Sequence, residues 1–155
     1  YYEQIILGYN YRMNDIQAAL GLSQTSRLNV YIQRRNELAG LYYKQLKNLD
    51  LILPVNEEDA LSSFHLYIIK ISENSKKVRD DLFRHLKKSS IGVNLHYIPI
   101  YNQPYFDKMG FNRDLFPNSE KYFKNAISIP IYPALKDDQV FLISEKIREF
   151  LWVYV

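Results

Sequence analysis

The sequence contains no cysteine, five glycines and a single tryptophan among its 155 residues. The lack of cysteine excludes disulfides, cysteine-ligated zinc, iron–sulfur clusters and thiol nucleophiles. The sequence also lacks a run of about 18 apolar residues, so we expect no membrane-spanning segment and no membrane partner. Residues 1–7 show no basic stretch followed by an apolar core, which argues against a signal peptide. These absences predict a cytoplasmic protein.

Charge of neither sign dominates the chain. Charged residues make up 24% of it and the formal net charge is +3. The basic residues gather only in pairs, at 34–35, 76–77 and 87–88, whereas a nucleic-acid-binding domain usually places Lys and Arg along one face. Solvated helix faces explain such pairs more simply, so we expect no nucleic acid partner. A hydrophobic content of 47% is typical of a folded globular chain.

Apolar residues recur every three or four positions between Asn14 and Asn48, which is the period of an α-helix with one buried face. Asn14 or Asp15 is suited to cap its start, because a side-chain oxygen can accept from the free N–H groups of the first turn. An unbroken helix over this range would be roughly 50 Å long. Gly21 and Gly40 interrupt the pattern and leave open a close contact, a bend or a division into two helices.

Shorter patterns fill the rest of the chain and predict a small sheet covered by helices. We expect strands at 51–54, 64–71, 93–98 and 126–131, helices at 75–88, at 118–124 and from Asp137 onward, and an irregular connection at 99–117. Helices packed on one face of a small sheet give an α+β layer as the predicted fold class. The irregular connection is rich in proline and aromatic residues, and connections of this length are usually functional.

The usual motifs of metal and phosphate chemistry are absent. Neither H-x-x-x-H nor H-E-x-x-H spacing occurs, so we expect no metal site. The chain contains no G-x-S-x-G serine elbow, Walker loop or G-x-G-x-x-G turn. Of the three histidines, His85 lies in a charged helical pattern that places it at the surface, and His65 lies in a predicted strand, where packing explains it. His96 adjoins the aromatic connection, and either packing or a functional role fits it there.

Residues 8–15, read as GYNYRMND, place an amide, a guanidinium and two phenols directly before the predicted long helix. The Asn10 amide can donate to a phosphate oxygen, and Arg12 can bind a phosphate through two parallel hydrogen bonds. The N–H groups of a helix N-terminus favour an anion at the same point. A glycine turn followed by a helix cap explains the same residues without a ligand, so both interpretations stand.

Four stretches of the chain match motifs of a known family. They are 8–21 (GYNYRMNDIQAALG), 63–67 (SFHLY), 96–105 (HYIPIYNQPY) and 126–133 (AISIPIYP). In this order they resemble the sugar aminotransferases of the DegT/DnrJ/EryC1/StrS family over nearly the whole chain. Within the family the resemblance is greatest to the transaminases of the pseudaminic acid pathway, which aminate a UDP-linked 4-keto sugar.

The resemblance implies a fold-type I enzyme that depends on pyridoxal 5′-phosphate (PLP) and works as a homodimer. In such enzymes an amino group, usually from glutamate, passes through the cofactor to a nucleotide-linked 4-keto-6-deoxy sugar for cell-surface polysaccharides or glycans. The resemblance also implies how the chain is organised. Residues 1–13 would end the large PLP domain, residues 14–50 would form a long connecting helix, and residues 51–155 would form the C-terminal small domain.

The resemblance assigns roles to five residues. Asn10 matches an asparagine that reaches across the dimer to the PLP phosphate of the other subunit, and Arg12 is its neighbour in the cofactor-binding motif. His96 and Tyr97 match residues near the sugar-nucleotide site, and Tyr105 matches the stretch that helps to close it. The alternatives are an ion pair at the helix start for Arg12, and packing for Tyr97 and Tyr105.

Two features depart from the family pattern. Tyr101 stands where many members have a second histidine, which leaves the sugar undefined. The Schiff-base lysine of the family lies upstream of the GYNYR run, in a stretch ending in Glu-Gly-Gly that this sequence lacks. We therefore expect the C-terminal part of a longer enzyme, inactive by itself. The alternatives are a non-catalytic dimerising remnant of the family and a PLP-dependent sugar dehydratase relative.

Overall fold

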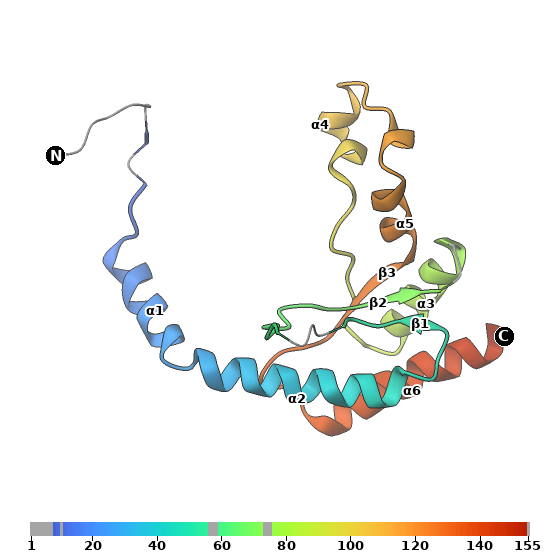
Figure 1. Cartoon of the computed structure of the whole chain (residues 1–155), viewed down its shortest axis with the longest axis horizontal. Helices are drawn as coiled ribbons and strands as arrows, with labels where there is room; N and C mark the ends of the chain where they lie inside the picture. Colours follow the sequence, from blue (N-terminus) through green and yellow to red (C-terminus); the bar gives the residue numbers. More distant parts are fainter. Residues whose placement is uncertain (1–7, 10, 56–58, 73–75, 155) are drawn as a thin grey trace.

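The computed structural model describes residues 8–9, 11–55, 59–72 and 76–154. They form a three-stranded antiparallel sheet with helices packed on it, which confirms the predicted α+β class (Figure 1). The strands are β1 (Leu51–Ile52), β2 (Tyr67–Ile71) and β3 (Ala126–Ile129). The helices are α1 (Asp15–Thr25), α2 (Leu28–Leu46), α3 (Lys76–Lys88), α4 (Pro104–Asp107), α5 (Pro117–Asn125) and α6 (Asp137–Tyr154), with 3₁₀ turns η1 (Ile100–Asn102) and η2 (Arg113–Leu115).

β2 is the central strand, and burial alternates along it. Tyr67, Ile69 and Ile71 are buried, whereas the two residues between them are half-buried. β1 pairs with the C-terminal end of β2. β3 pairs with β2 over a longer stretch, which begins with Tyr67 opposite Ile129. This period of two is what the aromatic and β-branched run in the sequence predicts. β3 is buried at all four positions.

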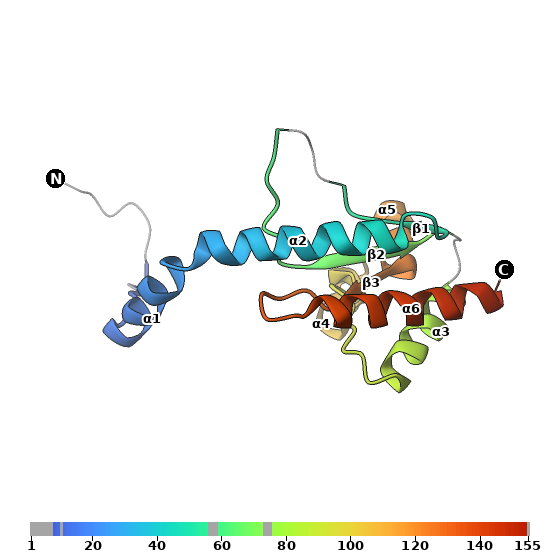
Figure 2. The same cartoon turned by 90° about the horizontal axis from the view of Figure 1, so that it is seen from below.

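Helices α2 and α6 lie side by side on one face of the sheet (Figures 1 and 2). Their apolar stripes meet the sheet and each other to form the core, together with the inner face of α3. The helical core residues are Leu38, Ala39, Tyr42 and Leu46 of α2, Leu82 and Leu86 of α3, and Val140, Ile143, Ile147, Phe150 and Leu151 of α6. Fully burying one such side chain stabilises the fold by about 1.5–3 kcal/mol. The core therefore uses only the second half of the long helical pattern.

Arg35 of α2 fastens that helix to the ends of two strands. Its guanidinium Nη1 donates to the carbonyls of Phe64 (2.8 Å), His65 (3.2 Å) and Ile131 (3.0 Å). Because two of these carbonyls precede β2 and are used by Arg35, the strand begins later than the sequence predicts. The His65 side chain is exposed, so the expectation that it packs within a strand is wrong.

The long helical pattern is divided into two helices, one of the outcomes that the sequence left open. The Thr25 hydroxyl donates to the carbonyl of Gly21 (2.9 Å), and the Ser26 hydroxyl bonds the turn before it in the same way. Such back-bonds from Ser and Thr bend helices. The division lies between Thr25 and Leu28, and therefore at neither Gly21 nor Gly40. A Cβ built at Gly21 or Gly40 would meet no atom of the described chain within 4 Å, so no contact there requires glycine.

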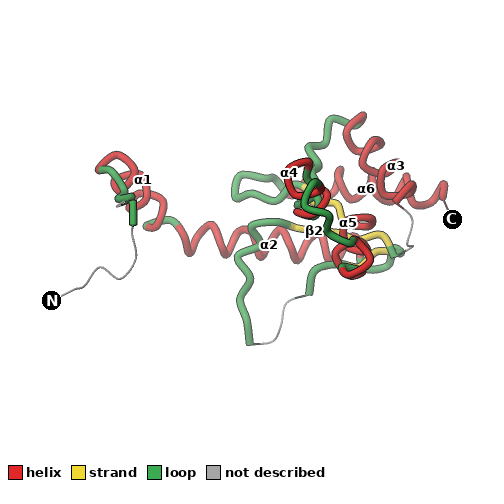
Figure 3. The backbone as a smooth tube through the Cα atoms, turned by 90° about the horizontal axis from the view of Figure 1, so that it is seen from above, coloured by secondary structure: helices red, strands yellow, loops and turns green. Residues whose placement is uncertain are grey.

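Helix α1 is capped as predicted but is not packed. The Asn14 side chain accepts from the Gln17 N–H (2.9 Å), and the Gln17 side chain accepts from the Asn14 N–H (3.1 Å). No residue of α1 is buried, and Ile16 is 82% exposed. Figure 3 shows α1 beyond the end of α2 and away from the sheet. Within the described chain, α1 adds no apolar burial to the core.

The strand predicted at 93–98 is reduced to a single bridge. Asn94 pairs with Ser128 of β3 through two backbone hydrogen bonds (3.1 and 2.8 Å), and no described neighbour continues the ladder. The Asn94 side chain accepts from the Leu95 N–H (2.8 Å), which turns the chain away from the sheet. The predicted cap of α3 at Ser75 falls outside the described residues.

Two expectations, that the chain has no membrane-spanning segment and no metal site, can be examined in the described residues. No helix among them is both long and apolar enough to pass through a membrane. They also contain no group of three or more His, Asp or Glu side chains placed to hold a metal ion.

The buried tyrosine of α2 gives a test of the core at high pH. The Tyr42 hydroxyl donates to the Pro130 carbonyl (2.8 Å), and burial, then the nearby Tyr67 and Tyr132, raise the pKa of Tyr42 above its usual value. Above a pH of about 10 the unfolded chain releases a proton that folded Tyr42 keeps, so the free energy of unfolding falls as pH rises. We expect Tyr42→Phe to reduce this slope by up to ~1.4 kcal/mol per pH unit, measured by urea unfolding. An unchanged slope would contradict the assignment.

Candidate functional site

His96 lies where the chain leaves the sheet after the Asn94 bridge. Its Nδ1 atom is 2.7 Å from the Oγ atom of Ser128, which is buried on β3. The Tyr97 ring stands edge-on to the imidazole, with 4.8 Å between ring centroids. The Ser128 hydroxyl therefore fixes the orientation of the imidazole, and Nε2 has no partner among the described residues.

A hollow of about 670 Å³ opens beside His96. It is lined by Tyr97, Ile98, Pro99, Ile100, Tyr101, Phe116, Asn118, Ser119 and Tyr122. Its aromatic faces can stack on a flat or ring-shaped ligand, while its hydroxyl and amide groups can hydrogen-bond one. The Tyr122 hydroxyl donates to the His96 carbonyl (3.2 Å), so the histidine and the hollow are joined directly.

Apart from Tyr97 and Ile98, the walls of the hollow belong to a lobe made of residues 99–125, which rises from the sheet on the side opposite α2 (Figure 1). Glu120 holds this lobe together. Its Oε1 atom accepts from the Tyr101 hydroxyl (3.0 Å) and from the Asn102 amide (3.2 Å). Burial, and then the bond to Glu120, raise the pKa of the Tyr101 phenol. Tyr101 also stacks on Phe116 at 4.7 Å, so this residue shapes the wall from inside.

Of the five predicted site residues, four lie in the described chain, and these four do not all come together. Tyr97 is 72% exposed at the hollow, and His96 adjoins it. Tyr105 is 70% exposed on α4, its ring edge-on to its neighbour, and it is not among the residues lining the hollow. Arg12 is exposed before α1, which stands far from the lobe in Figure 1, and Asn10 lies outside the described residues.

Sequence reasoning missed most of the wall of the hollow. It marked the connection at 99–117 as functional but did not single out Phe116, Ser119 or Tyr122. The available signal was proline at position 117 followed by a short helical pattern. A helix that begins at Pro117 brings its first turns back toward the first residues of the 99–117 connection.

A second hollow of about 730 Å³ lies beside Arg35, where two of the four family-like stretches, 63–67 and 126–133, meet the helices. Its lining includes Gln24, Tyr31 and Arg35 from the helices, Ser63 and His65 before β2, and Tyr132 after β3. The exposed His65 therefore lines a concave surface, a position that its sequence pattern does not predict. The Arg35 guanidinium has no carboxylate partner among the described residues.

The profile of the DegT/DnrJ/EryC1/StrS aminotransferase family matches residues 1–148. The chain belongs to this family. Its match to the spore coat polysaccharide biosynthesis protein SpsC of Bacillus subtilis is 37% identical and covers 97% of this chain and 40% of SpsC. Its match to the UDP-4-amino-4,6-dideoxy-N-acetyl-beta-L-altrosamine transaminase of Campylobacter jejuni is 31% identical and covers 95% of this chain and 41% of that enzyme.

Solved structures of family members have the same fold. Spr1654 of Streptococcus pneumoniae in its PLP form superposes with a TM-score of 0.89 at 27% identity, over 100% of this chain and 40% of that chain. Helicobacter pylori PseC, an aminotransferase of pseudaminic acid biosynthesis, superposes with a TM-score of 0.82 at 27% identity, over 97% of this chain and 41% of PseC. The chain thus spans about two fifths of the length of the relatives it matches.

The Glu120 contacts predict that the lobe depends on one carboxylate. We expect Glu120→Ala to leave Tyr101 and Asn102 without their shared acceptor, at a cost of about 1–3 kcal/mol within the lobe. Amide hydrogen exchange should accelerate in η1 and α4 but not in β2. Glu145→Ala, at an exposed position of α6, is the control. Equal protection of η1 in both variants would contradict the role of Glu120.

Proposed function

We propose that the chain is the C-terminal part of a PLP-dependent aminotransferase that acts as a cytoplasmic homodimer. The enzyme transfers an amino group, from glutamate, to a nucleotide-linked 4-keto-6-deoxy sugar for cell-surface polysaccharide or glycan biosynthesis. The observation that carries this proposal is the family match over residues 1–148 together with the aromatic and hydroxyl-lined hollow beside His96. The similarity to SpsC, a spore coat polysaccharide biosynthesis protein, and to the Campylobacter transaminase supports it.

The proposed organisation keeps the three segments expected from the family. Residues 1–13 end the large PLP domain, residues 14–50 form the helical connection and residues 51–155 form the small domain. Two observations support this division: α1 has no buried residue, and the described core runs from Leu38 to Leu151. We further propose that the covalent lysine is supplied by residues upstream of this segment, so that the 155 residues alone do not catalyse transamination.

Arg12 fits a phosphate group. Its side chain is exposed just before the capped start of α1, and no described residue pairs with it. A guanidinium can bind phosphate through two hydrogen bonds, and the first N–H groups of α1 add a favourable dipole. In the proposal Arg12 and Asn10 hold the phosphate of PLP at the other subunit. PLP supplies the electron sink for the reaction when it is bound.

The hollow beside His96 is the proposed sugar-nucleotide site. Tyr97 offers an exposed ring for stacking on a sugar or a base. His96 is oriented by Ser128, so its free Nε2 can hydrogen-bond a hydroxyl or carbonyl of the substrate. Tyr105 extends the site from α4 in this proposal and contacts substrate that reaches beyond the hollow.

The cofactor assignment is tested in the complete protein with Asn10→Ala and Arg12→Gln. Each variant loses hydrogen bonds to a charged phosphate, so we expect each to retain PLP about tenfold less tightly. Cofactor absorbance after dialysis measures this. Arg84→Gln, a largely exposed arginine of α3, should behave like the unsubstituted protein. Retention equal to the control would remove both residues from the cofactor site, and a complete protein that never takes up PLP would favour the non-catalytic remnant.

The substrate assignment is tested by Tyr97→Ala. We expect the KM for the sugar nucleotide to rise about tenfold, because a stacking surface is lost, while the reaction of the loaded enzyme with glutamate alone keeps its rate. Phe141→Ala on α6 is the control for losing an exposed aromatic ring. A variant slowed equally with both substrates would show that Tyr97 supports the fold rather than the sugar.

A further inference from the structure

Ser128 is a buried serine of β3 that is bonded to the segment carrying His96 at two points. It is 5% exposed. Its N–H donates to the Asn94 carbonyl (2.8 Å), and its own carbonyl accepts from the Asn94 N–H (3.1 Å). Its Oγ atom lies 2.7 Å from Nδ1 of His96. The main chain of Ser128 thus holds Asn94, and its side chain holds the imidazole two residues further on.

The hydroxyl proton of Ser128 has one acceptor in the described chain. No described residue other than His96 is hydrogen-bonded to that hydroxyl. A hydroxyl has one proton to donate, and a neutral imidazole carries its single N–H proton on either Nδ1 or Nε2. If Nδ1 carried it, Nδ1 would donate to Oγ, and the buried hydroxyl proton would have no acceptor. Buried polar hydrogens are rarely left in that state because it is costly.

The alternative arrangement satisfies both groups and fixes the tautomer. The Ser128 hydroxyl donates to Nδ1, so neutral His96 carries its proton on Nε2. Since Nδ1 faces the buried strand, Nε2 lies on the other side of the ring and is directed away from β3. His96 therefore presents a hydrogen-bond donor, and not an acceptor, to a ligand.

The rest of His96 is held as well, so the donor has a fixed position. The Tyr122 hydroxyl of α5 donates to the His96 carbonyl (3.2 Å). The Tyr97 ring stands edge-on to the imidazole, with 4.8 Å between centroids. A side chain whose two faces and backbone are restrained can hold a hydrogen bond to substrate in one direction.

The surroundings make the polarity of this donor matter. Among the described residues that line the hollow beside His96, none carries a charge. Ion pairing with these side chains therefore does not select a ligand, and the donors and acceptors of the wall do. An Nε2–H group pairs with an oxygen that has a free lone pair, and it disfavours a group that can only donate, such as an ammonium.

We propose that Ser128 is a positioning residue for substrate recognition. By donating to Nδ1 it keeps the proton of His96 on Nε2, and Nε2–H donates to an oxygen acceptor of the sugar nucleotide. The identity of the ligand rests on the proposed function, whereas the tautomer does not. The acceptor oxygen belongs either to the sugar or to the nucleotide, two sources with the same hydrogen-bonding chemistry.

The tautomer is tested in the complete protein labelled with ¹⁵N at histidine, at alkaline pH, where an imidazole is neutral. Two-bond ¹H–¹⁵N correlation spectra distinguish the ring nitrogen that carries the proton, and His96→Leu identifies the His96 signals by their loss. We expect the Nε2–H form of His96 in at least about tenfold excess in the unsubstituted protein. In Ser128→Ala a measurable share of the Nδ1–H form should appear.

Two further variants control the tautomer measurement. Ser128→Thr keeps a hydroxyl and should keep the Nε2–H form. Ser144→Ala removes another buried serine hydroxyl, on α6, and should leave the His96 signals unchanged. If the extra methyl group of threonine disturbs β3, the two alanine variants still decide the question. A proton on Nδ1 in the unsubstituted protein, or an unchanged tautomer ratio in Ser128→Ala, would overturn the proposal.

The contact with substrate is tested by turnover of a UDP-linked 4-keto-6-deoxy sugar, a member of the proposed substrate class. We expect Ser128→Ala to raise KM about fivefold and to leave kcat within about twofold, because a binding contact is lost. In a His96→Leu background the same exchange should raise KM no further, since Ser128 acts through the imidazole. Ser144→Ala should behave like the unsubstituted enzyme. An unchanged KM in Ser128→Ala, or a further fivefold rise in the His96→Leu background, would contradict the positioning role.

Binding of UDP alone locates the acceptor oxygen. Weaker UDP binding by Ser128→Ala places the acceptor on the nucleotide, and equal UDP binding with a raised KM places it on the sugar. The spectra need neither cofactor nor substrate, so the two proposals fail separately. The expected tautomer in a complete protein without turnover would contradict the proposed function, whereas turnover with the proton on Nδ1 would contradict only the role of Ser128.

Discussion

The fold depends on one cation that has no carboxylate partner in the described chain. Arg35 donates from a single nitrogen to three main-chain carbonyls, two that precede β2 and one that follows β3. Hydrogen bonds from a charged donor are about twice as strong as neutral ones, and here they replace the ladder bonds that these carbonyls would otherwise need. One of them belongs to Phe64, whose φ of 41° lies in the left-handed region that side chains disfavour.

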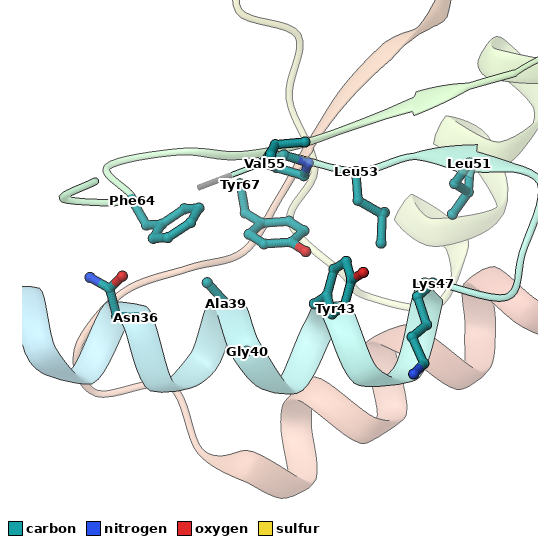
Figure 4. Close-up of a pocket in the computed structure, with 11 residues that line it drawn as sticks. Asn36, Ala39, Gly40, Tyr43, Lys47, Leu51, Leu53, Val55, Phe64 and Tyr67 are labelled. Carbon is teal, nitrogen blue, oxygen red and sulfur yellow. The ribbon is translucent and has the colours of Figure 1, made fainter. Parts of the chain in front are cut away.

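This constraint shapes the surface where β2 begins. By delaying the start of β2, Arg35 frees Ser63 and His65 to line the hollow beside α2 and Tyr132. The same turn sets Phe64 over α2 (Figure 4). On the other edge of β3, the described residues form the single Asn94 bridge, and the chain then leads through His96 into the lobe. Sheet, helices and lobe are thus arranged around the strand ends rather than the strand centres.

Much of the fold follows from periodicity, and less of the site does. The apolar stripe of α2 and the alternating residues of β2 are local sequence patterns whose apolar side chains become buried in the fold. The sequence therefore predicts both elements well. The break at Thr25 depends on hydroxyls that bond the preceding turn, which periodicity does not record. The strand expected at 93–98 has the right alternation, yet its length is decided by how much of β3 remains free to pair. Both features, the helix break and the shortened strand, come from competition for backbone hydrogen bonds.

The site is harder to predict because its parts come from residues that touch only after folding. His96 and Tyr97 stand out in the sequence through their neighbours, but Ser128 and Glu120 are ordinary polar residues until the structure places them 2.7 Å from the imidazole and 3.0 Å from the Tyr101 phenol. The proposed roles of Asn10 and Arg12 come from the family motif that contains them, which sequence comparison can recognise without any contact between side chains.

The lobe built on residues 99–125 meets the rest of the described chain through α5, which contacts α3 and β2, and through the Tyr122 hydroxyl, which donates to the His96 carbonyl. Its outer positions are exposed and bear little of the energy that keeps the sheet folded. Substitutions there can therefore change the shape of the hollow around Tyr97 without unfolding the sheet and its helices. Under the proposed function, a handful of changes in the lobe could alter which sugar is accepted, while Arg35 and the core beneath it stay fixed.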